Sequence, residues 1–371
     1  YRNVRADELL ATLFRHAAET AVLPERVSDI LVGCVGQHLE QGKNIARLAA
    51  LLAGYPDTVP AATVNRLCGS SQQAVVSSAQ AILLGDADFA LGGGVEVMSR
   101  GAYLMPALRS GARMGDTQAI DAMVAVLTDP FGVGHMGITA ENLAVKHGIS
   151  REQQDAFAVE SQNRAAKAIA EGRFKSQIAP ITLKTRKGDV VFDTDEHPRA
   201  GTTMETLAKM KPAFKKDGTV TAGNASGIND AAAALILADA AKAASGGHKP
   251  IARLVAYAIA GVPNDVMGEG PIPSTKVALQ KAGLTLDKID VIESNEAFAA
   301  QSLTVAKGLG FDPAKTNVNG GAIALGHPVG ATGAVIVTKL LHELIRTNGR
   351  YGIATMCIGG GQGITTIWER V

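Results

Sequence analysis

The same succession of elements occurs in both halves of the chain. In the first half, a turn at Cys68 leads into a helix and then to a glycine run at residues 92–94. In the second half, a turn at His327 leads into a helix and then to a glycine run at residues 359–361. An internal repeat of turn, helix and strand indicates a duplicated α/β unit. We therefore expect two α/β halves that face each other, with a site between them to which each half contributes a turn.

Cys68 lies between an apolar, β-prone run at residues 59–64 and a helical pattern, with Gly69 and Ser70 supplying a turn and a cap. A thiol at a helix N-terminus is favoured as thiolate, because the helix dipole and the free N–H groups stabilise its charge. The thiolate is the nucleophilic form. The stretch alone also fits a small buried apolar side chain, which is the usual role of a free cysteine. Both interpretations stay open at this point.

Apolar periodicity predicts further elements along the chain. We expect helices at residues 6–20, 44–53, 150–170 and 275–282, and strands at residues 29–35, 87–98, 231–243 and 251–259. The strand at 87–98 should be buried and end in its three glycines, where the backbone approaches another group closely. The helix after Ser150 opens on a capping box with Gln153. Between residues 99 and 227, prolines, short helices and charged turns replace the strand–helix alternation.

The balance of charges argues against a protein that coats nucleic acid. Of the 371 residues, 36 are Lys or Arg and 35 are Asp or Glu, which gives a net charge of +1, whereas nucleic-acid binding needs a basic surface. One stretch, from Arg173 to Lys216, is locally basic. Most of its charges are typical of a solvated face, but one or two would suit a phosphorylated ligand.

The chain has three cysteines, Cys34, Cys68 and Cys357, with no C-x-x-C pair and no framework spacing. An odd, small number indicates a reducing compartment, and a zinc site made from these three is not expected. There is no apolar run of transmembrane length and no signal peptide, so we expect a cytoplasmic protein. Because the first residue is Tyr1 rather than Met, the lack of an N-terminal signal is weak evidence.

Three Gly-rich segments next to apolar strands each carry one reactive group, namely Cys68, His327 and Cys357. Glycine lets a substrate reach the backbone N–H groups. A histidine beside a cysteine can take its proton, and a second cysteine can act as an acid or base on another atom. Two thiols with distinct tasks indicate carbon–carbon chemistry on a thioester rather than simple hydrolysis.

Six motifs follow one another along the chain: Asn65–Ser70, Gly134–Glu141, Gly223–Asn229, Asn295–Phe298, Gly326–Gly330 and Cys357–Gly360. In composition and order they resemble the motifs of the thiolases, which are acetyl-CoA C-acyltransferases. The resemblance extends over essentially the whole chain, from Tyr1 to Val371. It implies reversible, CoA-dependent thiolytic cleavage of 3-oxoacyl-CoA, or Claisen condensation of two acetyl-CoA molecules.

The resemblance implies a thiolase-like α/β fold with two duplicated halves in five-layered α-β-α-β-α order and an inserted loop domain. The N-terminal half would comprise residues 1–98 and 228–250, the CoA-binding loop domain residues 99–227, and the C-terminal half residues 251–371. It also implies a first β-strand, with an Arg-Thr-Pro turn, before Tyr1. A core sheet without that strand would expose an edge.

The resemblance further implies that Cys68 carries the acyl group, that His327 activates Cys68 and helps to bind a thioester oxygen, and that Cys357 moves the proton on the α-carbon. Asn295 would hold a water that shares one oxyanion hole with His327. The backbone N–H groups of Cys68 and Gly359 would form a second hole. Two holes are needed because the reaction alternates between a tetrahedral intermediate and an enolate.

Coenzyme A would be a substrate, with no permanently bound cofactor and no metal. The resemblance places Ser226 against its pantetheine chain and His135 and Met136 along its approach to Cys68. Arg199 is the basic residue expected near the nucleotide phosphates. Further contacts are expected along the channel from Phe214, Ala222 and Phe298.

As partners, the resemblance implies acyl-CoA substrates and a homodimer or homotetramer, with residues 102–128 pairing dimers; neither nucleic acid nor a membrane is expected. Tyr1–Ala6 and Asn44–Arg47 resemble degradative thiolases of bacterial fatty-acid oxidation complexes, which would add a hydratase/dehydrogenase subunit. His135 and the 102–128 insertion resemble the short-chain, acetoacetyl-CoA type instead. Chain length and physiological direction therefore stay open.

Two other functions compete with this interpretation. A decarboxylating ketosynthase-like condensing enzyme would share the fold, but that class lacks a cysteine in the role of Cys357. A non-catalytic acyl-CoA-binding subunit would have no use for two activated thiols beside His327.

Overall fold

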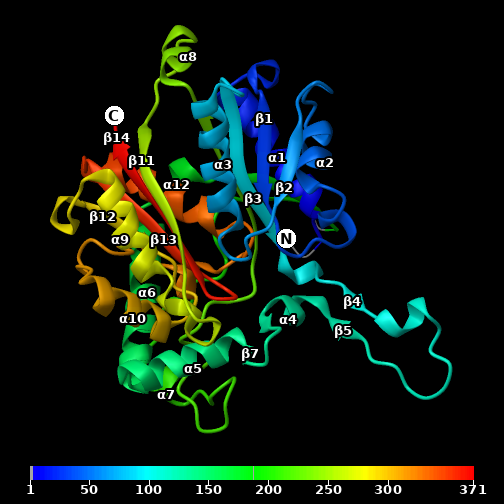
Figure 1. Cartoon of the computed structure of the whole chain (residues 1–371), viewed down its shortest axis with the longest axis vertical. Coiled ribbons are helices and arrows are strands. Elements are labelled where there is room, and N and C mark those ends of the chain that lie inside the picture. Colours follow the sequence, from blue (N-terminus) through cyan, green and yellow to red (C-terminus); the bar gives the residue numbers. More distant parts are fainter. Residues whose placement is uncertain (1–2, 187) are drawn as a thin grey trace.

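The computed structural model describes residues 3–186 and 188–371, and two four-stranded sheets organise it (Figure 1). The first sheet has the order β10-β3-β1-β2. Its strands are β1 (Asp29–Gly33), β2 (Ala61–Val64), β3 (Phe89–Val97) and β10 (Asp230–Ala238). The second has the order β11-β14-β13-β12. Its strands are β11 (Ala252–Gly261), β12 (Val291–Ser294), β13 (Tyr351–Ile358) and β14 (Gln362–Arg370).

The two sheets repeat one pairing pattern, as the internal repeat predicts. In the first sheet, β1 and β3 are parallel and β10 lies antiparallel to β3. In the second sheet, β12 and β13 are parallel and β14 lies antiparallel to β13. The repeat differs at both edges, since β2 pairs with the outer edge of β1 and no strand of the described residues pairs with the outer edge of β12. Strand β11 pairs with the outer edge of β14, whereas among the described residues β10 pairs with β3 alone, so its outer edge is open.

Helices and sheets alternate in five layers. Helices α3 (Ser70–Leu84) and α12 (Thr332–Thr347) contact each other and lie between the two sheets. Helices α1 (Ala6–Thr20) and α2 (Ile45–Leu52) pack on the first sheet, and α9 (Pro271–Ala282) packs on the second. The layer order is therefore α-β-α-β-α, with the two central helices following the Cys68 and His327 turns.

Apolar side chains fill the spaces between these layers. One cluster, which includes Leu10, Phe14, Ile30 and Leu91, joins α1 and α2 to the first sheet. A second cluster contains apolar residues of α3, α12, β13 and β14: Val75, Val76, Val337, Leu340, Met356 and Ile364. Because the second cluster belongs to both halves, it fixes the two halves against each other at the level of the candidate site.

The three glycines predicted at the end of a strand lie inside β3 instead. They pair with β1 on one side and with β10 on the other. A Cβ on Gly94 would lie 2.3 Å from the carbonyl oxygen of Gly330, and one on Gly92 would lie 2.8 Å from the Cα of Val75. The glycines therefore let α3 and the residues after His327 approach the sheet closely.

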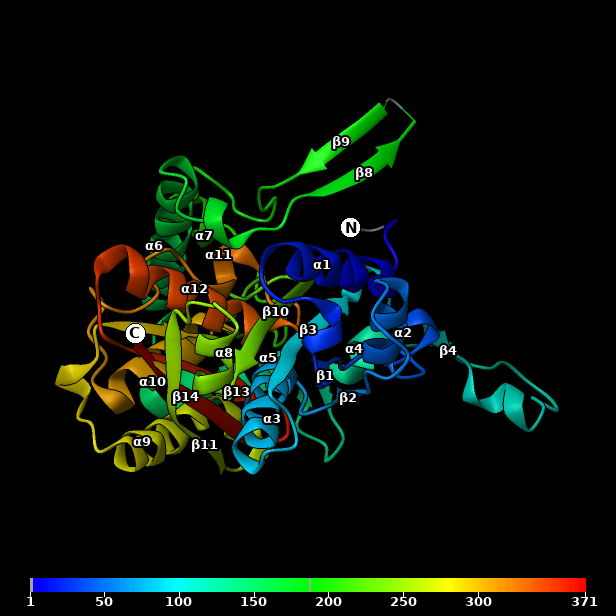
Figure 2. The same cartoon turned by 90° about the horizontal axis from the view of Figure 1, so that it is seen from above.

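Residues 99–227 form a less regular segment whose elements lie on more than one side of the two sheets (Figures 1 and 2). Its helices are α4 (Ala122–Val126), α5 (Met136–His147), α6 (Arg151–Ala170) and α7 (Met204–Ala208). Its strands are β4 (Tyr103–Leu104), β5 (Ile120–Asp121), β6 (Thr128–Asp129), β7 (Gly134–His135), β8 (Ile181–Thr185) and β9 (Gly188–Phe192). The β4–β5 arm and the β8–β9 hairpin both project from the body (Figure 2).

Most predicted elements agree with the structure. The helix at 6–20 has the predicted bounds, and α6 begins on the predicted capping box of Ser150 and Gln153. The Ala-rich segment predicted as a buried strand is the half-buried strand β10, and α8 (Ala240–Ser245) follows it. The remaining helices are α10 (Ala299–Leu309) and α11 (Ala322–Leu325).

Two further observations bear on the sequence predictions. Of the basic stretch, Lys187 lies outside the described residues, as do Tyr1 and Arg2. Across residues 3–186 and 188–371, the structure has no helix long and apolar enough to cross a membrane.

Candidate active site

The turn that carries Cys68 is held by its own backbone and by Ser70. The Ser70 hydroxyl accepts from the Arg66 N–H at 2.9 Å and donates to the Leu67 carbonyl at 2.6 Å. Leu67 has a φ of 46°, a left-handed conformation that is unfavourable for a residue with a side chain. Ser70 does not cap α3 as predicted, because the N-cap residue is Gly69 and no side chain accepts a bond there.

Gly69 and Gly359 show how closely the two halves meet at Cys68. A Cβ on Gly69 would lie 2.6 Å from Cδ1 of Ile358, at the end of β13. A Cβ on Gly359 would lie 3.4 Å from both Cδ1 of Leu67 and Sδ of Met136. The Cys68 turn is therefore pressed against the glycine run that ends β13.

The resting thiol of Cys68 is not the activated thiolate that its helix position predicts. Burial raises its pKa above the ordinary value, although the backbone N–H groups of Gly359 and of Cys68 itself oppose the shift by donating toward the sulfur. The desolvation of a charged sulfur between two packed halves outweighs the stabilisation by these two donors. The neutral thiol consequently needs a base to remove its proton.

Cys357 lies near Cys68, on β13, where its side chain is 1% exposed. Burial raises its pKa, and the charge of a Cys68 thiolate raises it further. Because the charge of Cys68 acts on Cys357, the two sulfur atoms lie close to each other. Because each anion disfavours the other, the pair suits a reaction in which the thiols are deprotonated in turn.

His327 enters the same neighbourhood from the second half. Its backbone N–H donates to Oδ1 of Asn229 at 3.0 Å, and its Nδ1 lies 2.7 Å from Oγ1 of Thr332. Its Nε2 is buried and has no hydrogen-bond partner among the described residues. Burial lowers the pKa of His327 to about 4, so the imidazole is neutral at physiological pH. A neutral imidazole with a free ring nitrogen can act as a base.

Packing joins the His327 turn to Cys68. Val329, two residues after His327, lies in a buried cluster with Val35 and Met98, and Cys68 packs against that cluster. The three segments predicted to carry the chemistry, those of Cys68, His327 and Cys357, are therefore brought together where the two halves meet.

A buried carboxylate links the two halves beside this cluster. Glu96 of β3 is 2% exposed. It accepts from the N–H groups of Val35 at 2.9 Å, of Gly36 at 3.0 Å and of Gly330 at 3.0 Å. Burial raises the pKa of Glu96 to about 7, and these three donors oppose the shift.

Asn295 is 1% exposed, and neither its amide oxygen nor its amide nitrogen has a hydrogen-bond partner among the described residues. Its neighbour Glu296 is fully bonded. The Glu296 carboxylate accepts from Ser161, Asn317 and the N–H of Ile323. Because buried amides are normally paired with protein, water or ligand, the side chain of Asn295 is suited to hold a water or a substrate oxygen.

Several residues predicted to contact coenzyme A form one apolar cluster around Cys357. Met136, Phe298 and Cys357 are buried in it, and Phe214 packs against it. The His135 ring is stacked on Phe214, with centroids 4.7 Å apart. The predicted contact residues of α5, of the 214 turn and of the segment before α10 therefore line one region next to the second thiol.

The other three predicted contacts lie differently. The Ser226 hydroxyl and N–H both donate to the Ala297 carbonyl at 3.0 Å, which places Ser226 beside Phe298. Ala222 is exposed, in the turn before Asn224. Arg199 is exposed, and its backbone N–H donates to Gln162. Among the described residues, the hydrogen bonds of Arg199 go to Gln162 and Glu196 and not to the apolar cluster around Cys357.

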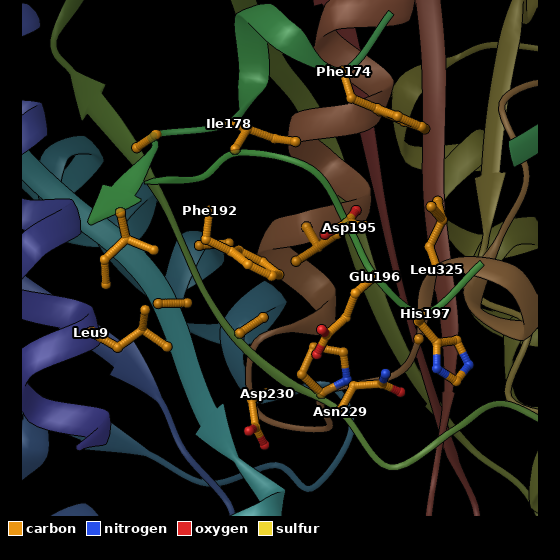
Figure 3. A pocket seen from close by; sticks show the side chains of 18 of the residues that line it. Leu9, Phe174, Ile178, Phe192, Asp195, Glu196, His197, Asn229, Asp230 and Leu325 are labelled. Carbon is orange, nitrogen blue, oxygen red and sulfur yellow. The ribbon is translucent and has the colours of Figure 1, made fainter. Parts of the chain in front are cut away.

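Arg199 instead is one of the residues that line a cavity of about 600 Å³ (Figure 3). The cavity lies between α1, the open edge of β10 and α12, and Leu9, Phe192 and Asn229 point into it. Its wall includes Gly326 and Pro328 but neither Cys68 nor Cys357. The described residues include no group of three or more His, Cys, Asp or Glu arranged to hold a metal.

Sequence reasoning missed three positioning residues. Asn229 stands in a motif noted for its resemblance, but no role was expected for it. Glu96 follows the glycine run, and Thr332 lies in the Gly-rich run after His327. A buried acid inside an apolar strand is unusual enough to have marked Glu96. No pattern in the sequence distinguishes Thr332 from other threonines at helix starts.

Comparison with known proteins gives a consistent result. The family model described as "Thiolase, N-terminal domain" matches residues 1–241, and that described as "Thiolase, C-terminal domain" matches residues 248–370. The chain is 55% identical to "Beta-ketothiolase BktB" of Cupriavidus necator, over 100% of this chain and 94% of that protein. It is 53% identical to an "Acetyl-CoA acetyltransferase" of Pseudomonas aeruginosa, over 99% of this chain and 94% of that protein.

Solved structures agree with the fold. The acetyl-CoA acetyltransferase of Bacillus anthracis superposes with a TM-score of 0.97 at 45% identity, covering 100% of this chain and 94% of that one. Human mitochondrial 3-ketoacyl-CoA thiolase in complex with CoA superposes with a TM-score of 0.96 at 43% identity, covering 100% of this chain and 93% of that one.

Proposed function

The chain belongs to the thiolase family, and on that premise we propose that Cys68 carries the acyl group in reversible, CoA-dependent cleavage of 3-oxoacyl-CoA. The enzyme is an acyltransferase, and coenzyme A and acyl-CoA are its substrates. The observation that carries the proposal is the meeting of the Cys68 turn, Cys357 and the His327 turn between the two halves.

In the first half-reaction, Nε2 of His327 takes the proton of the Cys68 thiol. The thiolate attacks the carbonyl carbon of the acyl donor, and the N–H groups of Cys68 and Gly359 stabilise the oxyanion that forms. Collapse of the tetrahedral intermediate breaks the bond to the leaving group and leaves an acyl thioester on Cys68. The Gly359 N–H donates toward the Cys68 sulfur and opposes the rise of its pKa. A donor in that place lies beside the reacting atom, which supports this assignment.

In the condensing direction, the CoA thiolate that leaves the first acyl donor takes the proton of Cys357, and the Cys357 thiolate then takes a proton from the α-carbon of a second acyl-CoA. The resulting α-carbanion of the second acyl-CoA attacks the acyl group on Cys68. The carbon–carbon bond forms as Cys68 leaves as thiolate. In cleavage, the same bond breaks and Cys357 returns the proton. Asn295, through a water, and His327 would stabilise the enolate oxygen. The unpartnered amide of Asn295 supports this role.

For coenzyme A, we propose that the pantetheine chain passes between Ser226 and the cluster of Met136, Phe214 and Phe298, with His135 at its side. The clustering of these side chains around Cys357 supports the path. Ala222 and Arg199 would lie toward the nucleotide end. We further propose that residues 99–227 act as the CoA-binding domain between halves at 1–98 with 228–250 and at 251–371.

The assembly we propose is a homodimer or homotetramer in which the projecting β4–β5 arm pairs dimers. The arm exposes large apolar side chains, among them Tyr103 at 68% and Met114 at 94%, and exposed apolar groups of this kind mark interaction surfaces. We also propose a reducing, cytoplasmic setting, because Cys34, Cys68 and Cys357 are all unbridged.

The test is an acyl-enzyme trapping experiment. Wild type and Cys68→Ser are mixed with acetoacetyl-CoA, quenched, digested and analysed by mass spectrometry, and thiolysis is assayed across 3-oxoacyl-CoA chain lengths from four carbons upward. Wild type should gain an acetyl group on the peptide that contains Cys68, and the Ser variant should gain none. Acetylation elsewhere, or turnover by the Ser variant, would contradict the proposal. Release of CO₂ from malonyl-CoA would favour a ketosynthase-like activity instead.

A further inference from the structure

Thr332 is the first residue of α12, 2% exposed, and its hydroxyl contacts two groups. Oγ1 lies 2.7 Å from Nδ1 of His327 and 2.9 Å from the carbonyl oxygen of Pro328. A threonine hydroxyl has one proton to donate and can accept in return. The position of that proton decides which nitrogen of His327 carries the hydrogen of the neutral ring.

Only one arrangement makes both contacts hydrogen bonds. The Pro328 carbonyl can only accept, so the hydroxyl proton must point to it, and Oγ1 then accepts from an Nδ1–H group. If the hydroxyl donated to Nδ1 instead, the oxygens of Thr332 and Pro328 would face each other at 2.9 Å with no proton between them. That carbonyl also accepts from the N–H groups of Ala331 and Thr332, which add no proton between the two oxygens.

We infer that Thr332 is a positioning residue that holds His327 as the Nδ1–H tautomer, which leaves the lone pair of Nε2 free toward the thiol. This rests on the proposed function of His327 as the base of Cys68. When Nε2 takes the proton, the Nδ1–H bond to Thr332 is already in place and the ring need not turn. The same Nε2–H then becomes a donor for a substrate oxygen, so one nitrogen serves both steps while the other stays bonded.

Helix α12 offers a matched control. Thr338 makes the same type of bond, from its hydroxyl to the Ala334 carbonyl at 2.9 Å, but has no contact with His327. Thr332→Val and Thr338→Val therefore each remove one hydroxyl from one helix and keep a branched side chain. Thr332→Ser keeps the hydroxyl and loses a methyl group. Glu96, which is bonded to Gly330 after the His327 turn, and the two thiols Cys68 and Cys357 are unchanged in all three variants.

The first readout is the tautomer itself, by ¹⁵N NMR of histidine-labelled resting enzyme at pH 7. We expect wild type, Thr332→Ser and Thr338→Val to show His327 protonated at Nδ1, and Thr332→Val to show a mixture or the Nε2–H form. A wild-type ring protonated at Nε2 would overturn the inference. This measurement needs no turnover, so it separates the inference from the proposed reaction.

The second readout is the rate of acylation of Cys68 by acetoacetyl-CoA, followed by quenched flow from pH 6 to 9. Thr332→Val should acylate roughly tenfold to a hundredfold more slowly, less than the full 10²–10⁴ that a general base contributes, with the KM for CoA unchanged. Thr332→Ser and Thr338→Val should stay within twofold of wild type. Equal losses in both Val variants would show a structural effect and overturn the inference, as would full activity in Thr332→Val. Should Thr332→Val fail to fold, the NMR of wild type and Thr332→Ser decides.

Discussion

The backbone N–H of Gly330 donates a hydrogen bond to the carboxylate of Glu96 at 3.0 Å. Gly330 lies three residues after His327, and Glu96 lies on β3 in the sheet of the first half. The bond therefore crosses between the halves and fixes the His327 turn relative to the half that carries Cys68.

Replacing Glu96 with Gln should impair catalysis more than binding. The Gln side chain has one acceptor oxygen, and its NH₂ would face a backbone N–H in place of the second oxygen. An unsatisfied buried donor costs about 1–3 kcal/mol, so we expect kcat to fall by roughly tenfold to a hundredfold with little change in KM. Glu40→Gln is the control, since Glu40 is also buried in the first half but pairs with Arg100. Equal losses in the two variants would assign Glu96 to general stability.

The same variant should change how stability depends on pH. Because burial raises the pKa of Glu96 to about 7, the folded protein holds this proton more tightly than the unfolded chain. The protonated Glu96 therefore adds to the free energy of unfolding below the ordinary carboxyl pKa, and this addition is lost as the pH rises to 7. In urea unfolding at pH 5, 6 and 7, wild type should lose up to about 1.4 kcal/mol per pH unit relative to Glu96→Gln. Glu293, also with a pKa raised to about 7, is present in both proteins. Parallel pH profiles would contradict the assignment.

Removing the second thiol should separate the two half-reactions. Cys357→Ala keeps Cys68, His327 and the Gly359 N–H, so the variant should still form the acyl-enzyme from acetyl-CoA, whose CoA can leave as a thiolate without Cys357. It lacks the base for the α-carbon and should not condense acetyl-CoA or exchange the α-protons of acetyl-CoA in ²H₂O. Quenched mass spectrometry measures the first property and NMR of the acyl methyl group the second. Condensation at the wild-type rate would show that Cys357 has no part in the mechanism. Cys34→Ala is the control, because it removes another buried thiol, 4.0 Å from Oε1 of Glu96, and should retain both activities.

The fold was predictable because its main signal is repeated. A turn, a helix and a glycine run occur in each half, and two occurrences of one pattern support each other where either alone would be weak. The proximity of Cys68 and Cys357 was expected from this repeat and from the motifs. Element bounds depended on local signals, namely the apolar periodicity of the helix at 6–20 and the capping box of the helix after Ser150.

What could not be predicted depends on packing between distant segments. The pKa of Cys68 is raised because the second half of the chain buries the thiol. That burial cannot be inferred from the position of the cysteine at the start of a helix. The glycines of β3 lie mid-strand because Gly330 and Val75 approach them from another part of the chain. Arg199 was expected near the nucleotide phosphates from the resemblance and from its charge, and its place in a cavity lined by α1 and α12 depends on packing between distant segments.

The proposed role of Arg199 in binding CoA can be tested by mutation. If it binds a phosphate of CoA, Arg199→Ala should raise the KM for CoA several-fold, with kcat little changed, because the contact is equal in ground and transition states. The effect should diminish as ionic strength rises. Arg186→Ala, on the exposed β8–β9 hairpin, is the control. An unchanged KM in Arg199→Ala would show that the Arg199 side chain does not bind CoA and is simply solvated.

Gly137 tests the CoA channel sterically. A Cβ there would lie 2.2 Å from the ring of Phe214, which is stacked on His135. Gly137→Ala should therefore displace Phe214 and raise the KM for acyl-CoA at least several-fold, while acylation at saturating substrate is less affected. Adding Phe214→Ala should relieve the clash, so the free energies of unfolding of the two single variants should not add. Additive losses would show that the two residues do not interact as described.

The β4–β5 arm should decide the size of the assembly. Its apolar side chains Leu104, Met105 and Leu108 are 44%, 41% and 55% exposed, which is unfavourable in water unless another copy covers them. Changing all three to Ser should leave catalysis per subunit near wild type, because the arm projects away from the body (Figure 2). Light scattering should show wild type as a tetramer and the triple variant as a dimer. Val190→Ser with Val191→Ser, on the exposed β8–β9 hairpin, controls for loss of exposed apolar surface in general. A wild type that is dimeric at all concentrations, or a triple variant that stays tetrameric, would exclude the arm as the contact between dimers.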